Sequence, residues 1–285
     1  MKISVVIRSH NDQQHIAETM RRLQAQQGVD FELYNIDDHS TDGTLEIIRS
    51  FNVPERIVCW PAPYVPGAVL NAAARLVPGD VVVFNNADCR PLDDRFLARL
   101  TAPFPATGES KLAAVFANQR PRPDARPLIR KDYERAFGDG KIAASWRHFF
   151  SLAAAAMPRQ LLLHYPFDET LQYSEDIEWS WRLRQRGFGI RYVLEALVEH
   201  SHNYTLAECR KRFYNEGVAE YRIFGEPARL WRSWLLPCAG ELLRDFSYLL
   251  RHGQLHKLPY EFGFRLVQRR AAYCGRRDAE RRDRG

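Results

Sequence analysis

The chain has 285 residues, of which 45% are hydrophobic, 12% aromatic and 27% charged, and its formal net charge is +6. This composition is typical of a globular protein with a sizeable core, and it excludes the collagen-like, low-complexity and disordered classes. The five cysteines are scattered without CxxC spacing, which argues for free thiols in the cytosol and against a zinc site. No apolar stretch approaches the roughly 20 residues of a membrane-spanning helix, and the N-terminus lacks a signal peptide's layout, so we expect a cytoplasmic protein.

Strand and helix patterns alternate in the first half of the chain. Four apolar runs predict buried strands: ISVVI (3–7), FELYNID (31–37), RIVCW (56–60) and VVVF (81–84). Three helices are expected between them: one capped by Asn11 or Asp12, TLEIIRSF capped by Ser40, Thr41 or Asp42, and GAVLNAAARLV (67–77). Strands separated by such helices predict βαβ units and a mainly parallel sheet.

The second half of the chain is less regular. QRPRPDARPL (119–128) predicts a polar loop, and SLAAAAMPR (151–159) is a small-residue stretch that allows close backbone approach. A helix is expected from near Glu175 to a C-cap at Gly187. IRYVLEALVEHSH (190–202) then predicts a strand with an extension, and the pattern that follows is helical.

Polar clusters follow three of the predicted strands: RSHND after the first, DDHS after the second and NNADCRP after the fourth. Ligands of open parallel sheets bind beyond the carboxyl ends of the strands, so these clusters predict a nucleotide-type crevice. There is no GxGxxG after the first strand and no GxxxxGK[ST] loop. The nucleotide would therefore be held by carboxylates, a metal ion and basic side chains.

The stretch NNADCRP contains a candidate metal ligand, Asp88, with the amide Asn86 two positions before it. A polar turn that closes a buried strand is the alternative. His200 and His202 alternate on a predicted extended segment and would point to opposite sides, so only one of them is expected to join a given site. One imidazole, one or two carboxylates and diphosphate oxygens would make a shell suited to Mn²⁺ or Mg²⁺.

Two pairs of adjacent acids could also carry chemistry. Asp37 and Asp38 end the second strand, where an ionised carboxylate can accept a hydrogen bond from a base imide or a ribose hydroxyl. An Asx turn is the alternative role of Asp38. Glu175 and Asp176 open a helix, whose N-terminus favours carboxylates, so they could cap that helix. A carboxylate in this position could equally act as a general base for a hydroxyl nucleophile.

The ordered segments SVVIRSHND, IDDHSTDGT, PGAVLNAAA, VVVFNNADCRP, SEDIEWSWRL and VEHSH resemble family 2 glycosyltransferases of the GT-A fold. FANQRPRPDARPLIRKDYERAF, PFDETLQYSEDIEW and EHSHNYTLAECRKRFYNEGVA are similar to the bacterial rhamnosyltransferase-like branch. The resemblance implies a GT-A catalytic domain over residues 1–205, with a Rossmann-like mixed, mainly parallel sheet flanked by helices. A helical C-terminal region, basic and amphipathic, would occupy residues 206–285.

The same resemblance implies an inverting hexosyltransferase of polysaccharide biosynthesis. It would move a sugar, with L-rhamnose as a candidate, from a nucleotide-diphosphate donor of the dTDP-rhamnose or UDP-sugar type to a saccharide or lipid-linked acceptor. Asp176 would be the catalytic base, and Glu175 would orient the acceptor. Asp88 and His200 would hold Mn²⁺ or Mg²⁺ on the diphosphate. The implied nucleotide contacts are His10, Asp37, Asp38, Asn86 and Arg182.

Two departures from the family pattern leave alternatives open. Asn86 replaces the first acid of the usual DxD pair, and AAAA (153–156) stands where glycines or asparagines are common. A GT-A fold that has lost catalysis and binds a nucleotide or saccharide is therefore one alternative. A sugar nucleotidyltransferase is another, although RSHND lacks the glycine-rich loop that such an enzyme needs.

The C-terminal region carries eight arginines against three acids from Arg265 onward. The segments LWRSWLLPCAGELLRDFSYLL and YEFGFRLVQRRAAY mix aromatic, apolar and basic residues, which is typical of a helix at an anionic membrane surface. We therefore expect peripheral contact with the inner face of the cell membrane, and no nucleic-acid partner. Packing on the catalytic domain or on another subunit is the alternative.

Overall fold

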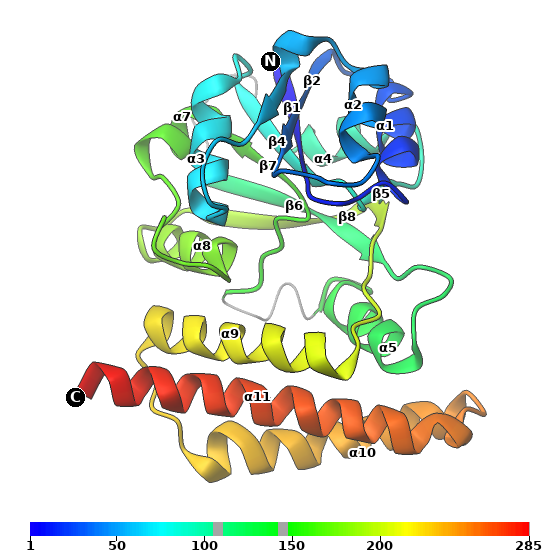
Figure 1. Ribbon diagram of the computed structural model, residues 1–285, viewed down its shortest axis with the longest axis vertical. Helices are drawn as coiled ribbons and strands as arrows, with labels where there is room; N and C mark the ends of the chain where they lie inside the picture. The colour runs from blue at the N-terminus through cyan, green and yellow to red at the C-terminus, as the bar shows by residue number, and fades with distance from the viewer. Residues whose placement is uncertain (105–110, 142–147, 285) are drawn as a thin grey trace. The chain divides into compact units, whose positions relative to one another are not determined.

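The computed structural model describes residues 1–104, 111–141 and 148–284. The chain divides into two compact units, shown in Figure 1. The first comprises residues 1–122, 133–170 and 175–200, and the second comprises residues 123–132, 171–174 and 201–285. The first unit contains the sheet, and the second contains the long C-terminal helices.

An eight-stranded sheet of order β3-β2-β1-β4-β7-β6-β8-β5 forms the centre of the first unit. The strands are β1 (Ile3–Ser9), β2 (Phe31–Asp37), β3 (Ile57–Cys59), β4 (Val81–Asn86), β5 (Arg90–Pro91), β6 (Leu112–Arg120), β7 (Ala154–Pro158) and β8 (Gly189–Glu199). Strand pairs β1–β2, β1–β4, β2–β3 and β6–β8 are parallel, whereas β4–β7, β6–β7 and β5–β8 are antiparallel. The predicted mixed, mainly parallel sheet is therefore confirmed.

Helices cover both faces of this sheet. They are α1 (Ile16–Gln24), α2 (Thr44–Phe51), α3 (Pro66–Leu76), α4 (Phe96–Thr101), α7 (Arg159–His164) and α8 (Glu175–Gln185). Helix α5 (Pro127–Ala136) runs across the division between the units. One core packs α1, α2 and α4 against one face of β1 and β4. The other packs α3, α7 and α8 against the opposite face. Alternate residues of β1 enter different cores, Val5 one and Val6 the other, because successive side chains of a strand point to opposite faces.

The first helix begins later than its predicted cap. Helix α1 starts after His15 without a side-chain cap, and Asn11 has a left-handed backbone with φ of 56°. The Asp12 carboxylate instead accepts a hydrogen bond from the His10 backbone N–H at 2.9 Å. The prediction that Asn11 or Asp12 caps α1 is wrong, because both residues belong to the loop that follows β1.

The alanine-rich stretch lies in the interior of the sheet. Residues Ala154–Pro158 form β7 between β4 and β6, and Ala155 pairs with Phe84 of β4. The small side chains leave room for the large aromatic residues around them. Of the four alanines that depart from the family pattern, Ala154–Ala156 therefore lie in the core strand β7, and Ala153 directly precedes it.

Three long helices make up most of the second unit: α9 (Leu206–Phe224), α10 (Leu236–Arg251) and α11 (Leu258–Arg284). A π-helical turn (Leu230–Leu235) and a 3₁₀ turn (Leu255–Lys257) flank α10. The backbones of α9 and α11 touch, because a Cβ atom at Gly217 would lie 2.1 Å from the Ala272 carbonyl oxygen. A Cβ atom at Gly275 would lie 1.9 Å from that of Tyr214. No helix in the described part of the chain is long and apolar enough to cross a membrane.

Arg265 lies fully buried in the second unit among carboxylates. Its guanidinium is 2.8 Å from Asp245, 3.0 Å from Glu241 and 2.9 Å from Asp132. Burial alone would lower the pKa of Arg265, but these three carboxylates raise it above its usual value. Arg269 is also paired with Glu241, so carboxylates inside the unit neutralise part of the positive charge that the chain carries from Arg265 onward.

Candidate functional site

The ends of β1, β2 and β4 bring three of the predicted polar clusters to one edge of the sheet. Ser9 pairs with Asp37 across β1 and β2, and Arg8 pairs with Asn86 across β1 and β4. Because the strands are parallel, their carboxyl ends lie side by side, as the sequence predicts. This edge belongs entirely to the first unit.

Asp37 and Asp38 have different surroundings. The buried Asp37 carboxylate accepts hydrogen bonds from the Ser9 hydroxyl at 2.9 Å and from the Ser40 backbone N–H and hydroxyl at 3.0 and 2.7 Å. Asp37 therefore holds the loop after β2. The Asp38 carboxylate is partly exposed, and its oxygens lie 3.8 Å from Nδ1 of His10 and 3.3 Å from Nδ1 of His39. The structure thus brings Asp38 and His10 together at an accessible position.

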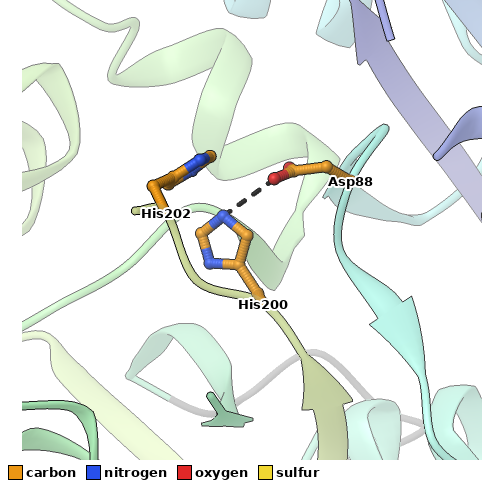
Figure 2. A group of neighbouring side chains, drawn as sticks. All are labelled: Asp88, His200 and His202. Carbon is orange, nitrogen blue, oxygen red and sulfur yellow. Dashed lines mark ion pairs between the residues drawn. The ribbon is translucent and has the colours of Figure 1, made fainter. Parts of the chain in front are cut away.

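Asp88 and His200 form the centre of the site and are both buried. Figure 2 shows the pair, in which Oδ1 of Asp88 lies 3.6 Å from Nε2 of His200. The other ring nitrogen, Nδ1, is 2.8 Å from Oε1 of Gln119. Gln119 donates through Nε2 to the Ser151 hydroxyl at 2.7 Å, which makes its Oε1 the acceptor for His200.

These hydrogen bonds place the proton of a neutral His200 on Nδ1. The lone pair at Nε2 then faces a carboxylate oxygen of Asp88, so two electron-pair donors lie opposite each other. Metal-ligating histidines commonly donate their second ring N–H in this way, which fixes the tautomer and the ring orientation. An imidazole nitrogen with a carboxylate oxygen suits Mn²⁺, and the oxygen suits Mg²⁺. The residues present therefore fit a divalent cation.

His202 is the third side chain labelled in Figure 2, and it belongs to the second unit. Among the described residues, Asp88, His200 and His202 are grouped as side chains that could hold a metal ion. Strand β8 ends at Glu199, so both histidines lie beyond it. The side-chain alternation of a strand therefore does not extend to these two residues, and the expectation that only one of them joins a given site stays a prediction.

Two arginines, Arg8 and Arg122, flank the stretch NNADCRP. Nη2 of Arg122 donates to the backbone carbonyl of Asp88 at 2.8 Å and to its Oδ2 at 3.0 Å, which leaves Oδ1 toward His200. Nη2 of Arg8 donates to Oδ1 of Asn86 at 3.1 Å, and its Nη1 lies 3.9 Å from Glu175. Arg8 is not among the residues that the sequence indicated, although it lies in RSHND. Its partners are 78 and 167 positions away in the chain.

The acidic pair of α8 stands at the start of the helix, as predicted. Asp176 accepts hydrogen bonds from the backbone N–H of Leu152 at 3.3 Å and of Ile177 at 2.8 Å. Both bonds favour the ionised carboxylate, as does the positive end of the helix dipole. Glu175 faces Arg8 and is thereby connected to Asn86.

Asp12 is a further acid of this edge that sequence reasoning treated only as a helix cap. Burial, with a smaller contribution from the negative charges of Asp88 and Asp42, raises the pKa of Asp12 to about 6, although the hydrogen bond from the His10 backbone N–H lowers it. The residue therefore contributes to a concentration of negative charge near Asp88. Its position in RSHND, directly after a predicted strand, was the available signal.

Arg182 is held on α8 and is not joined to the other site residues by its hydrogen bonds. Its guanidinium donates to Glu178 at 2.7 and 3.1 Å and to the Pro166 carbonyl oxygen at 2.7 Å. These contacts give Arg182 a role in fixing the loop before α8.

The family model described as glycosyl transferase family 2 matches residues 4–162. The O-antigen chain rhamnosyltransferase RfbN of Salmonella typhimurium is 26% identical over 235 residues, which cover 76% of this chain and 72% of that protein. The O-antigen chain rhamnosyltransferase WbaN of Salmonella anatum is 29% identical over 212 residues, which cover 70% of this chain and 66% of that protein.

Two solved structures share the fold. The mannosyltransferase PcManGT from Pyrobaculum calidifontis, in complex with GDP-Man and Mn²⁺, superposes with a TM-score of 0.67 at 18% identity, covering 97% of this chain and 86% of that one. The glucosyl-3-phosphoglycerate synthase from Mycobacterium tuberculosis, in complex with Mg²⁺ and uridine-diphosphate, gives a TM-score of 0.57 at 22% identity, covering 79% and 80%. At these identities the likeness establishes the fold alone.

Proposed function

Since the chain belongs to glycosyl transferase family 2 and is a rhamnosyltransferase-like enzyme of the GT-A fold, we propose that it is an inverting transferase. Its donor would be a nucleotide-diphosphate sugar, with dTDP-L-rhamnose as the first candidate, and its acceptor a saccharide or lipid-linked hydroxyl. The two similar Salmonella proteins are O-antigen chain rhamnosyltransferases, which supports this choice of sugar and of a glycan acceptor.

The nucleoside would bind at the accessible Asp38 and His10. A partly exposed carboxylate offers acceptors for a base imide or a ribose hydroxyl, and the exposed His10 ring can border the base. Asp37 supports this subsite by holding the loop, since its oxygens are already hydrogen-bonded to Ser9 and Ser40.

Asp88 and His200, both in the first unit, would hold the divalent cation. When bound, such an ion supplies positive charge to the diphosphate oxygens. The tautomer fixed by Gln119 is the observation that carries this part of the proposal. Asn86 brings no charge, so we expect weak binding of free cation and a shell completed by the diphosphate.

Arg8 and Arg122 would stabilise the departing diphosphate. Their guanidinium groups lie next to Asn86 and Asp88 and are largely buried, so they are positioned before the reaction begins. Fixed positive charge at the place where the leaving group gathers negative charge lowers the barrier without reorganisation. Arg122 lies in the RPRP sequence (120–123), and Arg182, the other arginine expected to contact the nucleotide, is paired with Glu178.

Asp176 would be the general base. In a single displacement, the acceptor oxygen forms a bond to the anomeric carbon while the bond from that carbon to the diphosphate oxygen breaks. The hydroxyl proton passes to the carboxylate of Asp176, and the nucleoside diphosphate leaves with the electron pair. Attack from the opposite side inverts the anomeric centre, and no protein nucleophile is needed. Glu175, paired with Arg8, would orient the acceptor.

The experiment that tests this function is a screen of dTDP-, UDP- and GDP-sugars with Mn²⁺, scored by release of nucleoside diphosphate. With the active donor, Asp176→Asn should lower turnover by about 100-fold or more, while nucleotide affinity stays within about twofold. Glu178→Gln, one turn from the start of the same helix, is the matched control and should remain active. Full turnover by Asp176→Asn would refute the assignment of the base.

Asn86 is the one observation that favours a second candidate, a nucleotide or saccharide binding protein without catalysis. The same screen separates the two. A binding protein would be stabilised by a nucleotide but would release no diphosphate with any donor or acceptor.

A further inference from the structure

Helix α10 in the second unit exposes a continuous apolar face. Leu236, Leu243, Phe246 and Leu250 are 64%, 72%, 45% and 53% exposed. Their spacings of seven, three and four residues place them on one side of the helix. An exposed face of this kind on a folded protein marks an interaction surface.

Exposed apolar residues also lie just before and just after α10. Leu230 and Trp231, in the π-helical turn before it, are 45% and 66% exposed. Leu255 and Tyr260, after it, are 40% and 47% exposed. Tryptophan and tyrosine are the residues that membrane-water interfaces favour, because each has an apolar ring and a polar atom.

The charges along this segment have one sign at the surface. Between residues 229 and 260 the acids are Glu241 and Asp245, and both are buried around Arg265. The exposed charged residues of the same segment are basic: Arg229, Arg232, Arg244, Arg251 and Lys257. The apolar face is therefore bordered by positive charge, and the acids that would offset it point inward.

This charge pattern decides what covers the face. A second copy of the chain, packed face to face, would place these basic residues against the same residues of its partner. A surface of anionic lipid headgroups would meet them with opposite charge while its acyl boundary receives the leucines and Phe246. We infer that α10 and its flanking turns, here called the α10 face, bind an anionic lipid surface in the plane of the membrane interface.

The sequence-based expectation named two membrane-facing segments, residues 230–250 and 260–273, and the inference keeps the first of them and not the second. The arginines of α11 include the buried Arg265, and Arg269 and Arg276 are paired with Glu241 and Glu220. The guanidinium groups of these three arginines are therefore ion-paired with carboxylates of the second unit. Most of the exposed large apolar residues of the second unit lie on the segment from 229 to 260, where exposed basic residues accompany them.

Sedimentation of the full-length protein with vesicles tests the inference. Binding is expected to phosphatidylcholine vesicles that contain about 30% phosphatidylglycerol, and to weaken with salt. Vesicles of phosphatidylcholine alone should bind at least tenfold less. Arg232→Gln with Arg251→Gln should lower the partition coefficient by roughly 10- to 30-fold. Leu243→Ser with Phe246→Ser should lower it by about tenfold or more.

Matched controls come from exposed residues of the first unit. Arg75→Gln with Arg95→Gln, and Leu76→Ser with Leu163→Ser, should bind vesicles like the unchanged protein. Unchanged circular dichroism and thermal midpoints establish that the variants of the α10 face remain folded. Failure of the unchanged protein to sediment with anionic vesicles, or equal binding by the α10 variants, would overturn the inference. So would a dimer in lipid-free solution that Leu243→Ser with Phe246→Ser converts to a monomer.

Discussion

Gln119 determines which ring nitrogen of His200 faces Asp88. Its Oε1 accepts the Nδ1 proton at 2.8 Å, and Nε2 lies 3.6 Å from Oδ1 of Asp88. Gln119 is itself oriented by Ser151. The candidate cation site therefore depends on a buried amide that contributes no ligand of its own.

Removing this amide should weaken cation binding. Gln119→Ala frees the imidazole to adopt either tautomer, so we expect Mn²⁺ affinity in the presence of nucleoside diphosphate to fall by about 10- to 100-fold. Gln119→Glu retains an acceptor for Nδ1 and should retain binding. Titration calorimetry measures both. An unchanged affinity in Gln119→Ala would show that Gln119 does not orient His200 for the cation.

The amide at position 86 should resist conversion into a metal ligand. Asn86→Asp would add a charge 3.1 Å from the guanidinium of Arg8, so the new carboxylate would pair with Arg8 rather than serve the cation. We expect Mn²⁺ affinity without nucleotide to rise by less than about threefold in this variant, and by about tenfold when Arg8→Met is also present. A double-mutant cycle of Mn²⁺ affinities gives the coupling free energy between Asn86→Asp and Arg8→Met. Equal gains in both backgrounds would contradict the role of Arg8.

Asp12 should make stability depend on pH in a defined window. Its folded-state pKa of about 6 lies above the ordinary 3.8, so the folded protein holds this proton more tightly than the unfolded chain. The stabilisation is fully present below the ordinary pKa and is lost as the pH rises through 6. Asp12→Asn does not titrate, so its thermal midpoint should rise relative to the unchanged protein between about pH 4 and about pH 7.

Differential scanning fluorimetry at several pH values checks this prediction. Asp94→Asn, at an exposed acid of the same unit, is the control. The difference between its thermal midpoint and that of the unchanged protein should not depend on pH. A constant difference for Asp12→Asn as well would mean that Asp12 is not buried as described.

The contact between α9 and α11 should tolerate only glycine. Gly275→Ala would place a Cβ atom 1.9 Å from the carbonyl oxygen of Tyr214, a backbone atom that cannot move alone. We expect a loss of about 3 kcal/mol or more in the free energy of unfolding. Gly263→Ala in the same helix meets nothing within 4 Å and should be neutral or stabilise by about 0.5–1 kcal/mol. Urea unfolding of the full chain compares them.

The sequence predicted the strands that carry their own hydrophobic signal. Strands β1 to β4 are runs of β-branched and aromatic residues, and they were located to within a few residues. Strand β7 was not predicted, because alanines carry little preference for a strand and Ala154–Pro158 is extended only through its neighbours β4 and β6. The start of α1 was placed too early because the side chain of Asp12 is used in the loop.

The site was predictable as a set of motifs but not as a set of contacts. Asp88, His200 and Asp176 were chosen from their positions at strand or helix ends. Their supporting partners could not be chosen in this way, since Gln119 lies 81 positions from His200 and Arg8 lies 78 positions from Asn86. Such pairs arise from the order of strands in the sheet, which local patterns do not encode.

Asp37 is buried and hydrogen-bonded, whereas Asp38 is partly exposed, and this difference bears on which residues could change donor preference. Asp37 is locked into the loop by Ser9 and Ser40, so it constrains the backbone and cannot vary without cost. The side chains of Asp38 and His10 are more exposed, and the His10 ring is hydrogen-bonded to the backbone carbonyl oxygen of Asp38. If the proposed nucleoside subsite is correct, substitutions at positions 10 and 38 would change nucleotide preference while Asp37 continues to hold the loop.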